Sequence, residues 1–235
     1  MKKEVTMEYR IAIDAMGGDN APHEILKGVV NAVNDDDSLQ VVLIGDQEAI
    51  KKELKDLHFN KDVEIVHTDQ WITMDDSPKK ALQEKPNASI ILATQLLHQG
   101  KADALVSAGN TGATVLAAAQ NLQMIEGIER AGLAAIYPAA RFHNPESHGF
   151  ALMLDVGATL HCTPKQLVHF AYMGNYYASH VLGIERPRVG LLNIGEEETK
   201  GGETLVKTHQ YLKNAPGIYF IGNVEGKDIP KGVAD

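Results

Sequence analysis

Residues 9–22 read YRIAIDAMGGDNAP, and this segment indicates the fold more clearly than any other. The first six of these residues form a short apolar run, typical of a β-strand that is buried on both faces. A loop of small residues with paired glycines follows, and Pro22 suits the first turn of a helix that we expect to end near Val33. A buried strand that leads directly into a helix predicts the first half of a βαβ unit.

The same alternation continues along the chain. We expect further strands at residues 40–45, 63–67, 104–107, 133–137, 150–155, 189–194 and 218–221. We expect further helices at residues 47–57, 88–98, 111–124, 164–182 and 202–213. Strands that alternate with helices of this length predict a mostly parallel sheet with helices on both faces. The predicted fold class is therefore α/β, with three layers (αβα).

Length and charge narrow the function classes. A chain of 235 residues fits a single α/β domain over residues 1–235. Its 22 Lys and Arg against 31 Asp and Glu give a net charge of −9, which argues against nucleic acid as a partner. The lone cysteine, Cys162, excludes an intrachain disulfide and fits a reducing compartment. No apolar run is long enough to span a membrane, so we expect a cytoplasmic protein.

Ligands of parallel α/β sheets bind where strands lead into helices, and the first such loop contains Asp14, Gly17, Gly18 and Asp19. The paired glycines would let the backbone approach a ligand, and the helix behind them would offer free N–H groups to an anion. The two carboxylates would repel a phosphate unless they orient donors or a cation. A tight turn whose aspartates cap the helix explains the spacing equally well.

The second loop contains Ser107, Asn110, Thr111 and Gly112. Backbone and hydroxyl donors at the start of a helix suit a tetrahedral anion, and this is the interpretation that we favour over plain close packing. The loop lacks the lysine of a nucleotide-binding P-loop, and no strand ends in G-x-G-x-x-G.

Two further loops follow apolar strands. One holds Asp155 and Gly157, and the other holds Asn193, Glu197 and Lys200. A solvated charged turn is the usual explanation for a run such as Glu196–Glu198. Because all four loops are predicted at one edge of the sheet, the set favours a ligand site more than any single loop does.

Metal and nucleophile chemistry find little support in the sequence. The ten histidines, among them His143 and His161, form no H-E-x-x-H pattern, and G-x-S-x-G is absent. Cys162 carries no signature of a nucleophile and fits a buried packing role. We therefore expect neither a metal nor a cofactor.

The loops resemble those of the bacterial phosphate acyltransferase family of phospholipid synthesis. The matching segments run in order along nearly the whole chain: IAIDAMGGDNAP (11–22), SAGNTGA (107–113), LDVGA (154–158), PRVGLLNIGEEETKG (187–201) and FIGNVEG (220–226).

The resemblance implies transfer of a fatty acyl group from acyl-carrier protein to inorganic phosphate, which gives acyl phosphate for a membrane glycerol-3-phosphate acyltransferase. It also implies a fold similar to the isocitrate and isopropylmalate dehydrogenases, a homodimer, and a cytoplasmic enzyme that works beside the inner face of the membrane. Because the chain is acidic, any association with the membrane should be local or occur through a partner.

The resemblance and the chemistry of acyl transfer suggest roles for the loop residues. Asn110, Thr111 and Gly112 would hold phosphate or the oxyanion, Lys200 would neutralise charge, and Asn193 would donate to the oxyanion. Asp14 and Glu197 would hold Lys200 or the glycine loop in place. The catalytic candidates are Lys200, Asn193 and Asn110; the binding candidates are Asp14, Gly17, Gly18, Asp19, Ser107, Thr111, Gly112, Asp155, Gly157 and Glu197.

The chain departs from the family pattern at several positions. Thr159 and His161 stand where the family carries an amide and a carboxylate, Gln83 replaces an arginine although Lys85 remains, and Ala131 replaces a proline. Family members also continue beyond the position of Asp235, so we expect the chain to be shortened at its C-terminus. These departures keep open a non-catalytic regulator that binds phosphate or acyl-carrier protein. An NAD-dependent hydroxy-acid dehydrogenase of the same fold would need a metal triad and an adenine pocket, and the sequence indicates neither.

Overall fold

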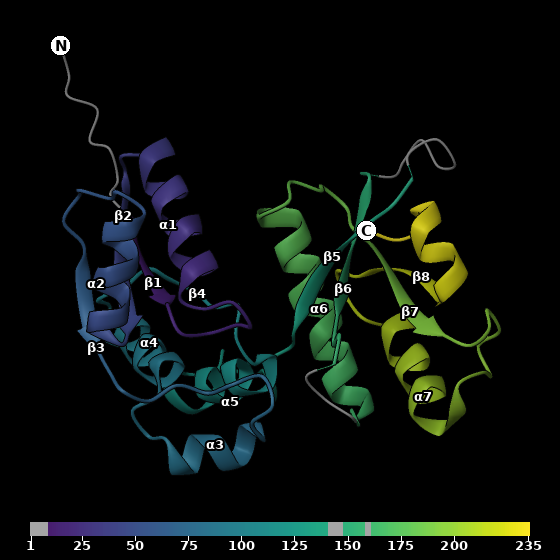
Figure 1. The fold of residues 1–235 in the computed structure, drawn as a ribbon. Coiled ribbons are helices and arrows are strands. Elements are labelled where there is room, and N and C mark those ends of the chain that lie inside the picture. The colour runs from purple at the N-terminus through teal and green to yellow at the C-terminus, as the bar shows by residue number, and fades with distance from the viewer. Residues whose placement is uncertain (1–8, 141–147, 158–160) are drawn as a thin grey trace. The chain divides into compact units, whose positions relative to one another are not determined.

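The computed structural model describes residues 9–140, 148–157 and 161–235 (Figure 1). The chain divides into two compact units, Met1–Gln123 and Met124–Asp235. Each unit contains its own strands and helices. This division does not test the prediction of one domain over residues 1–235, which stays a prediction.

The first unit is built on a four-stranded parallel sheet in the order β3-β2-β1-β4. Its strands are β1 (Tyr9–Asp14), β2 (Leu39–Gly45), β3 (Glu64–His67) and β4 (Ala104–Val106). Its helices are α1 (His23–Asp35), α2 (Gln47–Asp56), α3 (Pro78–Glu84), α4 (Ser89–His98) and α5 (Thr111–Asn121). Because β1 and β4 are parallel neighbours, the loops that follow them lie at the same edge of the sheet.

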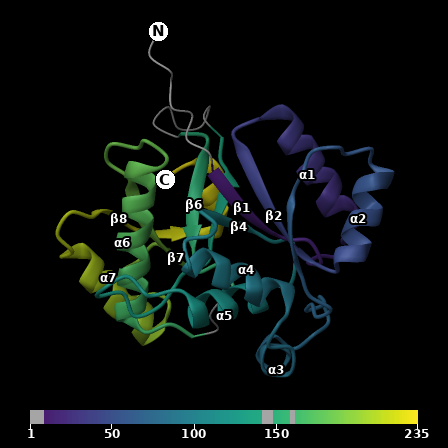
Figure 2. The same ribbon diagram turned by 90° about the vertical axis from the view of Figure 1, so that its left-hand side faces the viewer.

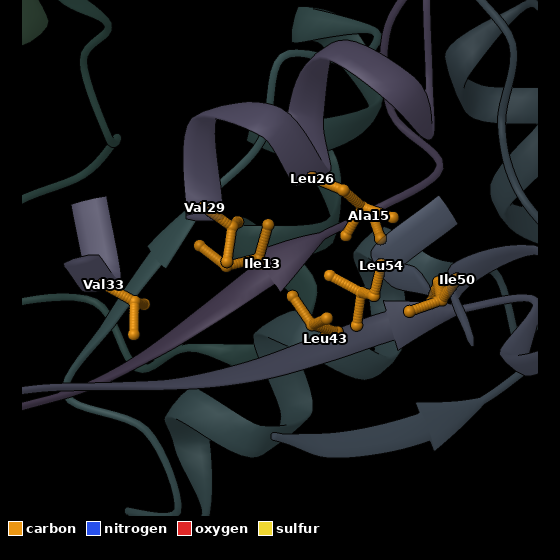
Figure 3. Packing of buried hydrophobic residues seen from close by; sticks show 8 residues of the cluster. All are labelled: Ile13, Ala15, Leu26, Val29, Val33, Leu43, Ile50 and Leu54. Carbon is orange, nitrogen blue, oxygen red and sulfur yellow. The ribbon is translucent and has the colours of Figure 1, made fainter. Parts of the chain in front are cut away.

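Alternation along the central strands separates two cores in this unit. Ile13 and Leu43 face α1 and α2 and pack with the fully buried Leu26, as Figure 3 shows. Ala12 and Val42 point to the opposite face, where they pack with residues of α4. Successive side chains of a strand point to opposite faces, so the sheet is covered on both. The first unit therefore has the predicted three layers.

The second unit contains two separate pairs of strands. The strands β5 (Ala134–Pro138) and β6 (Phe150–Leu154) form an antiparallel pair, whereas β7 (Arg188–Asn193) and β8 (Tyr219–Glu225) are parallel. The helical elements are α6 (Pro164–His180), α7 (Gly202–Lys213) and the 3-10 helix η1 (Gly226–Lys231). Figure 2 shows this unit from a second direction.

The antiparallel pair qualifies the prediction of a parallel sheet. The connection between β5 and β6 contains no described helix, and parallel strands need a crossover of a dozen or more residues. Residues 139–149 are too few for such a crossover, so the chain returns antiparallel. The mixed α/β architecture with mostly parallel strands is confirmed, and the antiparallel pair is an exception within it.

Two local predictions need correction. Pro22 lies at the N-cap of α1 and not in its first turn, since its carbonyl accepts the first helical hydrogen bond, from the Leu26 N–H at 2.9 Å. The helix α3 was not predicted, although Ser77 at its N-cap and Pro78 at its first position are typical of a helix start.

Candidate functional site

The parallel pairing of β1 with β4 brings together the first two candidate loops. Ser107 Oγ donates to Asp14 Oδ2 at 2.7 Å, and the Gly109 N–H donates to Ser107 Oγ at 3.1 Å. The Gly17 N–H donates to the Asp14 carbonyl at 3.3 Å. Asp14 is only 3% exposed. The buried carboxylate at the end of β1 therefore connects its own loop to the loop after β4.

The glycines of these loops are required by close contact. A Cβ at Gly17 would lie 2.4 Å from Asp14 Oδ2, and one at Gly109 would lie 3.0 Å from Gly17 Cα. Gly18 has a φ of +118°, and a Cβ there would lie 3.1 Å from the Ala108 carbonyl oxygen. Only glycine allows the two backbones to approach this closely. We call residues 14–18 and 107–112 together the anion cradle.

Asn110 caps α5 and holds a neighbouring loop. Its Oδ1 accepts from the Ala113 N–H at 3.1 Å. Its Nδ2 lies 3.1 to 3.3 Å from the carbonyl oxygens of Thr73, Met74 and Asp76. The carboxamide therefore uses both its acceptor and its donors within the protein. Direct donation from Asn110 to an oxyanion, as predicted from the sequence, would require some of these bonds to open.

The first turn of α5 presents donors for an anion. Thr111 and Gly112 occupy its first two positions, where backbone N–H groups have no partner within a helix. Within the described part of the chain, neither N–H donates to a protein acceptor. The macrodipole adds partial positive charge at this point, so the turn favours an anion.

The side chains around the cradle include one unpartnered acceptor. Asp14 Oδ1 is buried, and no hydrogen-bond partner for it lies among the described residues. Asp19, predicted as a binding residue, is exposed in the loop that leads to α1. Its position is open to a ligand, and no contact fixes its carboxylate among the described residues.

A salt bridge lies beside the cradle that the sequence did not identify as part of a site. Lys85 Nζ lies 2.6 Å from Asp76 Oδ2, which also accepts from the Thr73 N–H at 2.8 Å. The hydrogen bond from Lys85, followed by that from Thr73, lowers the pKa of Asp76 to about 2. The pair fixes the segment to which Asn110 donates. In the sequence, the only indication of this salt bridge was that Lys85 remains where nearby Gln83 replaces the arginine of the family.

We predict that Lys85→Met weakens the protein except in strong acid. The folded pKa of Asp76, about 2, lies below its ordinary value of 3.8, so this carboxylate stabilises the fold above that value and loses the effect as pH falls through about 2. The difference in unfolding free energy between wild type and Lys85→Met should therefore shrink from pH 5 to pH 2, as measured by urea denaturation.

Lys80→Met serves as the control, because Lys80 and Glu84 form an exposed pair 3.6 Å apart within α3, the helix that ends just before Lys85. Its difference from wild type should be small at every pH. An equal loss of stability in Lys85→Met at pH 2 and pH 5 would contradict the assigned role of the pair.

In the second unit, residues 194–201 connect β7 to α7, and we call this segment the Lys200 loop. Asn193 Nδ2 donates to the Lys200 carbonyl at 3.1 Å, and Asn193 Oδ1 accepts from the Ile194 N–H at 2.8 Å. Gly201 has a φ of +87°, and a Cβ there would lie 2.4 Å from Asn193 Oδ1. Asn193 is 8% exposed, so it anchors both ends of this loop from a buried position.

Lys200 itself is exposed. Its N–H donates to the Glu197 carbonyl at 3.1 Å. Among the described residues, no carboxylate lies within 4.0 Å of its ammonium group, so the Glu197 side chain does not pair with it. The Glu197 carbonyl also accepts from Asn223 Nδ2 at 2.8 Å. Glu197 is thus held through its backbone carbonyl, and the Lys200 ammonium has no ion-pair partner among the described residues.

Asp155 directly follows β6 and has an unusual conformation, with a φ of +65°. Its Oδ2 accepts from the Cys162 thiol at 3.0 Å, and its buried Oδ1 has no partner among the described residues. Cys162 therefore acts as a hydrogen-bond donor, beyond the predicted packing role. Gly157 follows with a φ of +116°, and His161 is exposed. Thr159 and His143 lie outside the described residues.

Groups of metal ligands and helices that could cross a membrane are both absent from the described residues. In these residues, no group of three or more His, Cys, Asp and Glu side chains is placed to hold a metal ion. No helix among them is both long enough and apolar enough to cross a membrane.

Sequence comparison finds close similarity to curated proteins. A family described as "Fatty acid synthesis protein" matches residues 9–235. The chain is 47% identical over 228 residues to the phosphate acyltransferase of Heliobacterium modesticaldum, which covers 96% of this chain and 65% of that protein. It is 46% identical to the phosphate acyltransferase of Moorella thermoacetica, covering 96% of this chain and 64% of that one. The chain thus spans slightly less than two thirds of these relatives.

Structural comparison supports the fold. The EutD phosphotransacetylase from Staphylococcus aureus superposes with a TM-score of 0.61, covering 97% of this chain and 74% of that one. The sequences are 15% identical, so the likeness concerns the fold alone. It agrees with a mixed α/β architecture in which helices cover a mostly parallel sheet.

Proposed function

The chain belongs to the fatty acid synthesis protein family. From this membership we propose that the protein transfers a fatty acyl group to inorganic phosphate. The observation that carries the proposal is the identity of 43 to 47% with phosphate acyltransferases over 96% of the chain. The acyl donor in this proposal is acyl-carrier protein, and the product is acyl phosphate.

The anion cradle supports phosphate as the acceptor substrate. The N–H groups of Thr111 and Gly112 would bind phosphate oxygens, and the close-packed glycines leave no side chain in the way. Asn110 acts in this proposal mainly by capping α5 and holding residues 73–76 beside it. Asp14 and Ser107 keep the two loops of the cradle together.

The reaction needs no covalent enzyme intermediate. A phosphate oxygen forms a bond to the thioester carbonyl carbon, the carbon–sulfur bond breaks, and the departing thiolate takes the proton of hydrogenphosphate. Orientation and stabilisation of the oxyanion are what the protein must supply. In this proposal the Lys200 ammonium neutralises the charge that gathers on the reacting groups, and Asn193 holds its loop.

We further propose a homodimer in the cytoplasm with a fold similar to isocitrate and isopropylmalate dehydrogenases. The protein would work beside the inner face of the membrane and pass acyl phosphate to a glycerol-3-phosphate acyltransferase. The family resemblance supports these assignments. With a net charge of −9, contact with anionic lipid would be confined to a local surface or occur through a partner.

A regulator that binds without turnover is the second candidate, because Thr159 and His161 depart from the family pattern in the loop after Asp155. Such a protein would bind phosphate or acyl-carrier protein and release no acyl phosphate. The same assay separates the two functions.

The test combines the protein with palmitoyl-acyl-carrier protein and phosphate, and traps acyl phosphate with hydroxylamine. We expect hydroxamate that depends on phosphate. Reactions without phosphate, or with sulfate in its place, measure direct attack of hydroxylamine on the thioester. The Heliobacterium relative serves as the positive control. Absence of phosphate-dependent product, while phosphate and the carrier protein still bind, would favour the regulator.

A further inference from the structure

A buried histidine in the second unit lies behind the Lys200 loop. His209 of α7 is 4% exposed, and its ring lies edge-on to Phe220 with centroids 5.0 Å apart. Buried polar groups are costly unless they form hydrogen bonds. The hydrogen-bond partners of this ring therefore indicate which segments it holds in place. None of these partners belongs to the anion cradle.

The hydrogen bonds of Asn223 determine which ring nitrogen carries a proton. Asn223 Nδ2 donates to the Glu197 carbonyl at 2.8 Å, so its Oδ1 is the atom that faces His209 Nδ1 at 2.9 Å. A carboxamide oxygen can only accept a hydrogen bond. His209 Nδ1 therefore donates, and a chain of two hydrogen bonds runs from α7 through β8 to the Lys200 loop.

The second ring nitrogen faces a carboxylate. His209 Nε2 lies 3.5 Å from Glu198 Oε1, which also lies 2.9 Å from Lys213 Nζ. The hydrogen bond from Lys213 is the main cause that lowers the pKa of Glu198, so the carboxylate is ionised near neutral pH. With Nδ1 already protonated, a neutral ring turns a lone pair toward this carboxylate. A doubly protonated ring turns an N–H toward it and forms an ion pair.

The charges around the ring are few. Glu198 comes from the Lys200 loop, and Lys213 comes from α7 one turn beyond the histidine. The β8 side of the ring is covered by Phe220 and Asn223, which carry no charge. Protonation of His209 therefore acts mainly on Glu198, next to the residue whose carbonyl Asn223 holds.

We infer that His209 is a positioning residue for the Lys200 loop, and that its doubly protonated form holds this loop more firmly than its neutral form. It acts on the loop at two adjacent points, through Asn223 on Glu197 and directly on Glu198. Asn193 fixes the far end of the same loop at Lys200. The expected effect on turnover rests on the proposed function. The expected effect on hydrogen exchange in the loop does not.

The protonation of the ring nitrogens determines how the order of the loop changes with pH. When the ring carries two protons, the ion pair with Glu198 should hold the loop, and when it carries one, the lone pair should repel the same carboxylate. Hydrogen exchange is compared at pH 5.5 and pH 8.5. Protection of the amides of residues 196–200 from hydrogen exchange, corrected for the intrinsic exchange rate, should therefore fall as pH rises.

The experiment compares wild type with His209→Gln and His209→Phe. Glutamine can still donate to Asn223 but carries no charge, so it should keep most of the protection and lose its pH dependence. Phenylalanine removes the donor, and protection of residues 196–200 should fall about tenfold, as expected for one lost hydrogen bond. His98→Gln, an exposed histidine at the end of α4, is the matched control and should resemble wild type at both pH values.

Protection of residues 189–191 in β7 reports whether each variant is folded. Unchanged loop protection in a folded His209→Phe, or pH dependence that survives in His209→Gln, would overturn the inference. Should the acyl transfer assay show activity, kcat should fall several-fold in His209→Phe. Should that assay fail, loop exchange alone still decides the role of His209, so the two failures are distinguishable.

Discussion

Lys200→Ala is expected to lower kcat for acyl phosphate formation by about 10²- to 10³-fold, the range typical for loss of one group that stabilises developing charge. The ammonium group is exposed, and no carboxylate among the described residues neutralises it. In the proposed mechanism this charge acts on phosphate and the oxyanion. Steady-state rates of phosphate-dependent hydroxamate formation measure the effect.

The control for this prediction is Lys207→Ala, which removes an exposed lysine from α7. This variant should retain wild-type kcat. Both variants should unfold at wild-type urea concentrations, because neither side chain is buried. Lys200→Arg should restore part of the rate, since it keeps the charge but changes its geometry. Unchanged turnover in Lys200→Ala would remove Lys200 from the proposed mechanism.

Gly17→Ala is expected to destabilise the first unit by about 2–3 kcal/mol, as overpacking does, and to abolish phosphate binding at the anion cradle. The new methyl group would lie 2.4 Å from Asp14 Oδ2. The Asp14 side chain cannot move aside without loss of its hydrogen bond to Ser107. The clash must therefore break this hydrogen bond, which joins the two loops. Urea denaturation measures the first effect, and phosphate titration by calorimetry measures the second.

Gly28→Ala is the matched control. Gly28 lies within α1, and a Cβ there would have no heavy atom within 4 Å. Alanine favours a helix over glycine, so this variant should be more stable by about 0.5–1 kcal/mol and should bind phosphate normally. Equal stability of Gly17→Ala and wild type would show that the side chains of Asp14 and Ser107 are not packed against Gly17.

Local sequence patterns are enough to predict the individual strands and helices. The predictions of a strand over Tyr9–Asp14 and a helix over Gly202–Lys213 are confirmed to the residue. Each depends on a short apolar run or a helical pattern bounded by glycines, which are local properties. The parallel order of β1 and β4 likewise follows from the helices between strands, and it brings the loop glycines of the cradle together.

Which side chains are engaged within the protein depends on contacts between distant parts of the chain. Asn110 is engaged with carbonyl groups 34 to 37 residues earlier in the chain, and His209 reaches the Lys200 loop through Asn223. No local pattern specifies such partners, because a hydrogen bond between distant residues forms only when packing brings donor and acceptor within reach. Residue type and loop position identified the candidates, whereas the folded contacts divided them into residues that hold the site and residues that remain open to a ligand.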